Sequence, residues 1–167
     1  MTPVNRLQND IVLINRKTTV FCLNAFCLLL LSGFSYAENL DLQPDPELSP
    51  QQVVLFQLKA LQSASDEGIA ATFRFASPAN RKITGPLQRF SRLFESSQYQ
   101  PMISHKSADI KLINSDDQTA ELQASLIDDA GNIHKYRFRL SKQKTAPFID
   151  CWMTDAVIAV PHSDRSA

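Results

Sequence analysis

Hydrophobic residues follow three successive patterns along the chain. A mainly apolar run, interrupted by Asn24, occupies residues 18–34, a helical spacing follows from about residue 50, and alternation of apolar and polar residues begins after Tyr99. These patterns predict a leader segment, then a group of helices, and then a set of strands.

The first pattern is typical of a cleaved signal peptide. Arg16 and Lys17 precede the apolar run, and Ser35 and Ala37 supply small residues at the two positions that a signal peptidase reads. We therefore expect residues 1–37 to be removed during export to the periplasm or the extracellular space. The alternative is an uncleaved membrane anchor, although the run is at the short end of what spans a bilayer.

The helical spacing begins with a strong start signal. Residues 49–52 (SPQQ) form a capping box with proline at the first helical position. An apolar stripe through Val54, Leu58 and Leu61 follows. These features predict a helix from Pro50 to about Ser63.

Two further helices are expected in the same half of the chain. A short one has Asp66 as its cap and ends before Ser77-Pro78, because a residue that precedes proline avoids the helical conformation. Another opens at Thr84-Gly85-Pro86 and carries apolar residues on one side. Between them, the proline and asparagine of residues 77–81 (SPANR) predict a fixed turn.

The alternating pattern predicts four strands joined by turns. They fall within residues 108–112, 120–126, 134–140 and 148–160. The two clearest strands each have one apolar and one charged face, which is typical of an antiparallel sheet covered on one side only. The predicted fold class is α+β, with N-terminal helices packed on one face of a curved antiparallel sheet of about four strands.

These patterns divide the chain into four parts. We expect a signal peptide at residues 1–37, an acidic, proline-containing linker at 38–48, a single α+β domain at 49–160 and a disordered tail at 161–167.

Charge and cysteine content restrict the partners. The leader holds three of the 17 basic and one of the 17 acidic residues, which leaves 14 basic and 16 acidic residues and argues against nucleic-acid binding. There is no second long apolar run, so no membrane span is expected after cleavage. Glu121 with Lys135 and Arg137 predicts cross-strand ion pairs on the outer face. Cys151 alone remains without the leader, so no internal disulfide can form, and its apolar neighbours predict a buried, unreactive thiol.

Three blocks of the domain carry a family resemblance. They are residues 73–94 (FRFASPANRKITGPLQRFSRLF), 99–105 (YQPMISH) and 150–160 (DCWMTDAVIAV). They resemble domain-of-unknown-function family 4864 over residues 49–160. That family is similar in element order to the nuclear transport factor 2-like cone, in which three helices lie against a strongly bent antiparallel sheet and leave a pocket between them. The resemblance implies this cone and its pocket; it implies no particular chemistry.

A pocket of this kind suggests candidate lining residues. They are Phe73, Arg81, Phe90, His105, Tyr136, Phe138, Trp152 and Asp155. Some enzymes of the cone fold, ketosteroid isomerase among them, place a carboxylate base and a tyrosine donor in the pocket. Here Tyr136 is on the inward face of its strand, and Asp150 and Asp155 interrupt the last strand. The other interpretation is a core tyrosine with a bonded hydroxyl, and aspartates that cap turns or pair with arginine.

Other candidates have similarly plain alternatives. Trp152 could be a stacking floor for a ligand or an anchor of the core. Arg81 could bind a carboxylate, close the mouth of the pocket or form an internal salt bridge. The three histidines are too widely spaced for a metal site, and no CxxC or HExxH motif occurs, so no metal and no cofactor is expected.

Two functions remain open at this point. The first is a non-enzymatic exported module that binds a small apolar ligand or a protein partner through the pocket or its rim, as a monomer or a homodimer. The second is a small isomerase- or dehydratase-like enzyme that performs acid–base chemistry with Tyr136 and Asp150 or Asp155.

Overall fold

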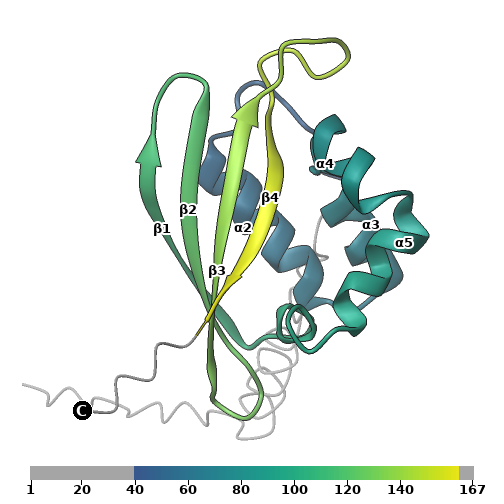
Figure 1. The fold of residues 1–167 in the computed structure, drawn as a ribbon, viewed down its shortest axis with the longest axis vertical. Helices are drawn as coiled ribbons and strands as arrows, with labels where there is room; N and C mark the ends of the chain where they lie inside the picture. Colours follow the sequence, from purple (N-terminus) through teal and green to yellow (C-terminus); the bar gives the residue numbers. More distant parts are fainter. Residues whose placement is uncertain (1–39, 162–167) are drawn as a thin grey trace, which may run out of the picture. The chain divides into compact units, whose positions relative to one another are not determined.

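The computed structural model describes residues 40–161, all of which belong to the unit Glu38–Ala167 (Figure 1). The predicted signal peptide at residues 1–37 lies outside the described residues, as does the predicted tail beyond residue 161. Within the described range, no helix combines the length and the apolar character needed to cross a membrane.

Helix α2 (Pro50–Gln62) begins where the capping box predicts. Ser49 Oγ accepts a hydrogen bond from Gln52 N, and the side chain of Gln52 accepts one from Ser49 N. The predicted apolar stripe is buried against the sheet, where Leu58 and Leu61 are at most 1% exposed. Burial of this stripe, more than helix propensity, is what stabilises a helix of this length.

Helix α3 (Asp66–Arg74) packs closely on α2. Ser65 Oγ accepts a hydrogen bond from Gly68 N, so Ser65 is the cap and Asp66 is the first helical residue. A Cβ atom at Gly68 would collide with the carbonyl oxygen of Ala60 on α2. The two helices can approach this closely only because residue 68 is glycine.

Helix α4 (Pro78–Thr84) occupies the segment that the sequence predicted to be a fixed turn. Ser77 Oγ accepts a hydrogen bond from Asn80 N at 3.1 Å, and Pro78 is the first helical residue. The turn prediction was wrong because serine followed by proline starts a helix here, as it does at Ser49. The helix ends at Gly85, whose φ of 84° favours glycine.

The third predicted helix is divided into shorter pieces. Helix α5 (Leu87–Ser91) runs into the 3₁₀ helix η2 (Arg92–Glu95), and a second 3₁₀ helix, η3 (Gln100–Met102), precedes the sheet. Phe90 and Phe94 lie on one side of this segment, with their ring centroids 5.4 Å apart. This segment therefore contributes an aromatic face to the helical layer.

The sheet contains four antiparallel strands in chain order. They are β1 (Ser107–Ser115), β2 (Thr119–Ile127), β3 (Ile133–Lys142) and β4 (Trp152–Val160). The sheet is curved and unclosed, and the helices lie on one face of it (Figure 1). This confirms the predicted α+β class, with helices that precede a four-stranded antiparallel sheet.

The last strand is shorter than predicted. Residues 148–151 form a turn in which Asp150 has a φ of 59° and donates its backbone N–H to Gln143 O at 2.8 Å. Asp150 is consequently exposed and does not belong to β4. Cys151 is 3% exposed, and burial raises the pKa of its thiol, as expected for a structural cysteine.

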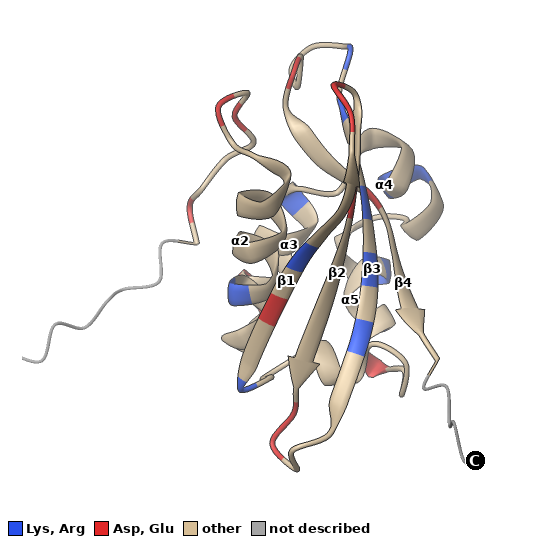
Figure 2. Cartoon of the chain, turned by 90° about the vertical axis from the view of Figure 1, so that its left-hand side faces the viewer, with Lys and Arg blue, Asp and Glu red and all other residues tan. Residues whose placement is uncertain are grey.

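The two faces of the sheet differ as the alternating pattern predicts. The inward residues of β2 and β3 are buried in the core, and they are Ala120, Leu122, Ala124, Leu126, Tyr136, Phe138 and Leu140. Charged residues lie along β1 and β3 (Figure 2), at exposed positions that alternate with the inward ones. On the exposed face Arg137 Nε is 3.1 Å from Glu121 Oε1, which confirms a cross-strand ion pair.

The N-terminal part of the described chain contacts the helices. Arg74 Nη1 donates hydrogen bonds to the carbonyl oxygens of Leu40 and Leu42, both at 2.8 Å. Leu42 and Leu48 pack against the core. The predicted linker therefore rests on the domain over residues 40–48.

Candidate functional site

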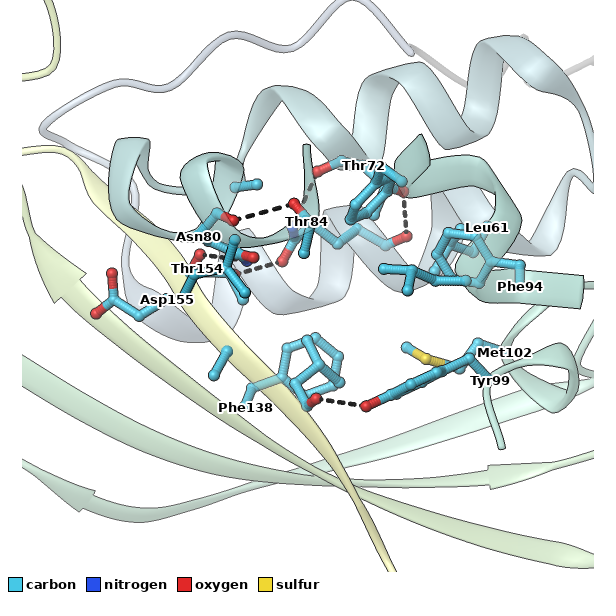
Figure 3. A pocket seen from close by; sticks show the side chains of 17 residues that line it. Leu61, Thr72, Asn80, Thr84, Phe94, Tyr99, Met102, Phe138, Thr154 and Asp155 are labelled. Carbon is cyan, nitrogen blue, oxygen red and sulfur yellow. Dashed lines mark hydrogen bonds between the residues drawn. The ribbon is translucent and has the colours of Figure 1, made fainter. Parts of the chain in front are cut away.

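A cavity of about 260 Å³ lies between the helices and strands β3 and β4 (Figure 3). Every helical segment from α2 to η3 contributes to its wall, so the cavity lies along the boundary between the helical layer and strands β3 and β4. Its lining is mainly apolar, with polar groups gathered at the end near α4 and the start of β4.

The apolar end of the cavity is formed near η2 and η3. Phe94, Tyr99 and Met102 line this end, with Leu61 from α2 and Phe138 from β3 beside them (Figure 3). These are large side chains whose faces can contact a flat or branched apolar molecule. The apolar end supplies contact area and shape.

The polar end is a network of neutral side chains. Thr154 Oγ1 donates to Gln57 Oε1 at 2.7 Å, and Gln57 Nε2 donates to Thr72 O at 3.0 Å. Asn80 Nδ2 donates to Thr154 O at 3.0 Å, and Thr84 Oγ1 donates to Asn80 O at 3.0 Å. These bonds hold the amides and hydroxyls in fixed orientations around the cavity.

This network leaves hydrogen-bonding capacity unused. The side-chain nitrogens of Gln57 and Asn80 each donate one hydrogen bond within the described residues, although an amide nitrogen carries two protons. The side-chain oxygen of Asn80 accepts no hydrogen bond from any described residue. The polar end can therefore both donate to and accept from a bound molecule.

Within the described residues, the helical layer is bonded to β4 at Thr154 and at Val157, and the cavity lies beside these attachments. Thr154 N donates to Phe75 O at 2.8 Å, and Ser77 N donates to Thr154 O at 2.9 Å. Immediately after Thr154, the pairing of β3 with β4 is interrupted by a bulge at Asp155. A bulge bends its strand, and beyond this point the cavity is lined by Val157 of β4 and by aromatic residues of the helical segments.

Two tyrosines lie at the far side of the cavity, and both hydroxyls have partners. Tyr99 lines the cavity and donates to Val157 O at 3.0 Å, whereas Tyr136 lies outside the lining and donates to Gln98 O at 3.0 Å. Their rings stack, with centroids 6.3 Å apart. Burial raises the pKa of Tyr99, and it raises the pKa of Tyr136 to about 12, so both phenols are neutral at ordinary pH.

The two candidate carboxylates have different positions. Asp155 is half-buried and lies at one end of the lining, on the β4 bulge (Figure 3). Asp150 is exposed in the turn before β4 and does not line the cavity. The structure therefore does not bring Tyr136 together with either aspartate in one lined space.

The eight residues suggested by the sequence separate into two groups. Those that line the cavity are Phe90, Phe138 and Asp155. Those that lie elsewhere are Phe73, Arg81, His105, Tyr136 and Trp152. The second group packs around the cavity or in the core.

Arg81 holds the end of α3 instead of forming the internal salt bridge that the sequence suggested. Its guanidinium donates to Ala76 O at 2.9 Å and to Arg74 O at 2.7 Å. It also lies over the rings of Phe73, at 5.0 Å, and Phe148, at 5.7 Å. The salt-bridge interpretation was wrong because backbone carbonyls at the C-terminal end of a helix, which lack partners within the helix, also attract a cation.

Trp152 and His105 have structural environments. Trp152 is 7% exposed, belongs to the core cluster and lies under Lys142 Nζ at 5.5 Å, which supports the anchor interpretation. His105 is 3% exposed, and its Nδ1 is 2.9 Å from Met102 O. No cluster of three metal-binding side chains occurs within residues 40–161.

The sequence did not indicate the polar residues of the cavity. Gln57 and Thr72 lie on buried faces of their helices, and Thr154 lies within an apolar strand; all three are at most 5% exposed. A polar residue on an otherwise apolar stripe is a detectable signal. Its partner cannot be read from the sequence, because Gln57 and Thr154 are 97 positions apart.

A family model matches the chain over residues 45–167, and its description is Domain of unknown function (DUF4864). The chain belongs to this family. The match confirms the family resemblance noted in the sequence, and the DUF4864 region includes every residue that lines the cavity. A comparison with curated proteins gives no match. The similarity to the nuclear transport factor 2-like cone stays a prediction.

Proposed function

We propose that this DUF4864 domain binds a small, neutral and mainly apolar molecule in the cavity between its helices and its sheet, and that it is not an enzyme. The observation that carries the proposal is an apolar cavity that ends in oriented amides and hydroxyls with unused hydrogen-bonding capacity. Sites for small molecules commonly combine an apolar wall with a few fixed polar groups.

The volume of the cavity limits the size of the ligand. An apolar cavity of about 150 Å³ accommodates benzene. By proportion, the cavity of about 260 Å³ holds about ten non-hydrogen atoms. A bicyclic aromatic molecule or a short branched alcohol has this size, whereas a long-chain lipid is too large to be enclosed.

The charges around the cavity favour a neutral ligand. Among the described residues, the lining includes no lysine, arginine or histidine and a single carboxylate, that of Asp155. A bound anion would lose its hydration without gaining a cation and would lie near a like charge. A hydroxyl or a primary amide could instead donate to Asn80 Oδ1 and accept from an amide N–H of the same network.

The acid–base alternative has weaker support. It requires Tyr136 and a carboxylate beside the same bound molecule. Tyr136 lies outside the lining, where its hydroxyl donates a hydrogen bond to Gln98 O, and Asp150 is exposed in a turn. Asp155 lines the cavity, whereas Tyr136 does not, and the hydroxyl of Tyr99, which does, donates its hydrogen bond to Val157 O.

We also propose that the protein acts outside the cytoplasm, on the basis of the signal-peptide pattern at residues 1–37. Mass spectrometry of the protein recovered from the exported fraction should find Glu38 at its N-terminus. Recovery of the intact Met1 terminus in the membrane fraction would contradict this proposal.

Two probes of similar shape test the binding proposal. 2-Naphthol and 2-naphthoate share a bicyclic ring, but only the second is an anion at neutral pH. At roughly half a kcal/mol for each non-hydrogen atom, 2-naphthol should bind with a Kd on the order of 100 µM. Isothermal titration calorimetry should show saturable binding of 2-naphthol and at least about tenfold weaker binding of 2-naphthoate. Equal affinities would refute the preference for neutral ligands, and no binding of either probe would argue against the cavity as a ligand site.

A further inference from the structure

Strand β1 is an open edge of the sheet within the described residues. It pairs with β2 on one side and has no neighbour on the other. Nearly all of its residues are exposed, including Leu112 at 45% and Ile113 at 52%. An edge strand with unpaired backbone groups and exposed apolar side chains can accept another strand.

The opposite edge of the sheet is occupied in part. Strand β4 bonds to the helical layer through Thr154, and Val157 O accepts the hydroxyl of Tyr99. A strand that approached β4 would have to compete with these bonds. The edge that remains available for pairing is therefore β1.

We propose that two copies of this chain pair through β1, antiparallel to each other, about a two-fold axis at Ile110. The reason is the order of charges along the strand. Asp109 and Lys111 are exposed on either side of Ile110, and they alternate with Ala108 and Ile110, which pack against the core. Neither forms an ion pair within the described residues.

This register places opposite charges face to face. When Ile110 lies opposite Ile110 of the second copy, Asp109 lies opposite Lys111 of that copy, and Lys111 lies opposite its Asp109. Opposite charges in directly facing positions stabilise an antiparallel pair, and like charges in those positions destabilise it. The symmetric pairing thus contains two favourable charge pairs.

The neighbouring registers are unfavourable. Side chains that face each other across an antiparallel pair must point to the same side of the sheet. A two-fold pairing can therefore shift only by moving its axis from Ile110 to a neighbouring residue. A shift in one direction puts Asp109 opposite Asp109, and a shift in the other puts Lys111 opposite Lys111. The charges of β1 therefore select a single register.

The inner face of β1 is compatible with the same register. Ala108 would lie opposite Leu112 of the second copy and cover part of its exposed surface. Ala108 and Ile110 already pack against the core, so the apolar faces of the two sheets would become continuous. The bulge between Leu112 and Asn114 ends the regular part of the strand, so the pairing is short.

Charge exchange tests this pairing. The full chain is expressed, and the exported protein is examined by sedimentation velocity over a concentration series. Asp109→Lys alone puts lysine opposite lysine, and Lys111→Asp alone puts aspartate opposite aspartate. Each should weaken the dimer at least about tenfold. The double variant D109K/K111D restores opposite charges in the same register and should restore the dimer.

A matched control separates the pairing from general effects of charge. Lys135→Glu changes an exposed charge on β3, away from the edge, and should leave the dimer unchanged. Circular dichroism establishes that each variant is folded. A monomer at all concentrations, a dimer insensitive to the single changes, or a double variant that stays monomeric would each overturn the proposal. All these outcomes are independent of ligand binding in the cavity.

Discussion

Replacement of Thr154 by valine should weaken the polar end of the cavity without changing its shape. Valine has nearly the shape of threonine but no hydroxyl. The change removes the 2.7 Å hydrogen bond from Thr154 Oγ1 to Gln57 Oε1, and Thr154 is 1% exposed. Gln57 is 3% exposed, so water has little access to the acceptor that loses its donor.

The magnitude follows from this loss of a buried partner. A hydrogen bond contributes about 0.5–1.5 kcal/mol net, and an acceptor left buried without a donor costs about 1–3 kcal/mol. We expect Thr154→Val to lower the free energy of unfolding by about 1–3 kcal/mol. The backbone bonds of residue 154 to Phe75 and Ser77 are retained, so the fold should persist.

Urea unfolding monitored by tryptophan fluorescence measures this change. Trp152 is the one tryptophan in the chain and is 7% exposed, so its emission should report the loss of the core. Thr145→Val is the matched control, because Thr145 is exposed and its change should stay within about 0.5 kcal/mol. If Thr154→Val is no more destabilising than Thr145→Val, the hydrogen bond to Gln57 does not hold the cavity as described.

Three further predictions concern the surroundings of the cavity. Arg81→Met should lower the free energy of unfolding by about 1–3 kcal/mol, because two carbonyl oxygens lose their donor. Arg81→Lys should recover only part of this stability in urea unfolding. Full recovery would mean that a single ammonium replaces both hydrogen bonds of the guanidinium, contrary to this account. In an absorbance titration, Tyr99 and Tyr136 of the folded protein should ionise above the ordinary pKa of about 10, with Tyr136 near 12. The pKa of Tyr136 is higher in the folded than in the unfolded protein, so the neutral phenol stabilises the fold fully below pH 10, and this stabilisation is lost between about pH 10 and 12. If the tyrosines ionise at the same pH in the folded protein and in urea, this prediction is contradicted. In Leu61→Phe the added ring can enter the cavity, so the free energy of unfolding should be nearly unchanged. Leu58 is fully buried and does not line the cavity, so Leu58→Phe should lower the free energy of unfolding by about 1–3 kcal/mol. Equal losses would mean that the cavity offers no usable space.

Most of the secondary structure could be predicted because its signals are local. The capping box at Ser49 fixed the start of α2, and alternation of apolar and charged residues indicated the strands and their buried faces. Helix α4 was missed although Ser77-Pro78 carries the same start signal. Its short length and its asparagine favoured the interpretation as a turn.

The cavity could be predicted only through the family resemblance, and its polar residues could not be predicted at all. Arg81 lies close in sequence to the carbonyls that it binds, but nothing in the sequence distinguishes these acceptors from a carboxylate. Gln57 and Thr154 meet only because β4, the last strand in the chain, lies against the helical layer. Asp150 lies in a turn outside β4 because its backbone N–H bonds to Gln143 O. The sequence pattern of side chains does not indicate such a backbone bond.

Titration of 2-naphthol into the wild-type protein and two leucine variants tests the proposed ligand site most directly. Leu61 lines the cavity, whereas Leu87 is 38% exposed on α5 and does not line it. We expect saturable binding to the wild type and to Leu87→Phe, and binding about tenfold weaker or absent in Leu61→Phe, because the added ring atoms occupy the space of the ligand. Equal binding by all three proteins would contradict the cavity as the site.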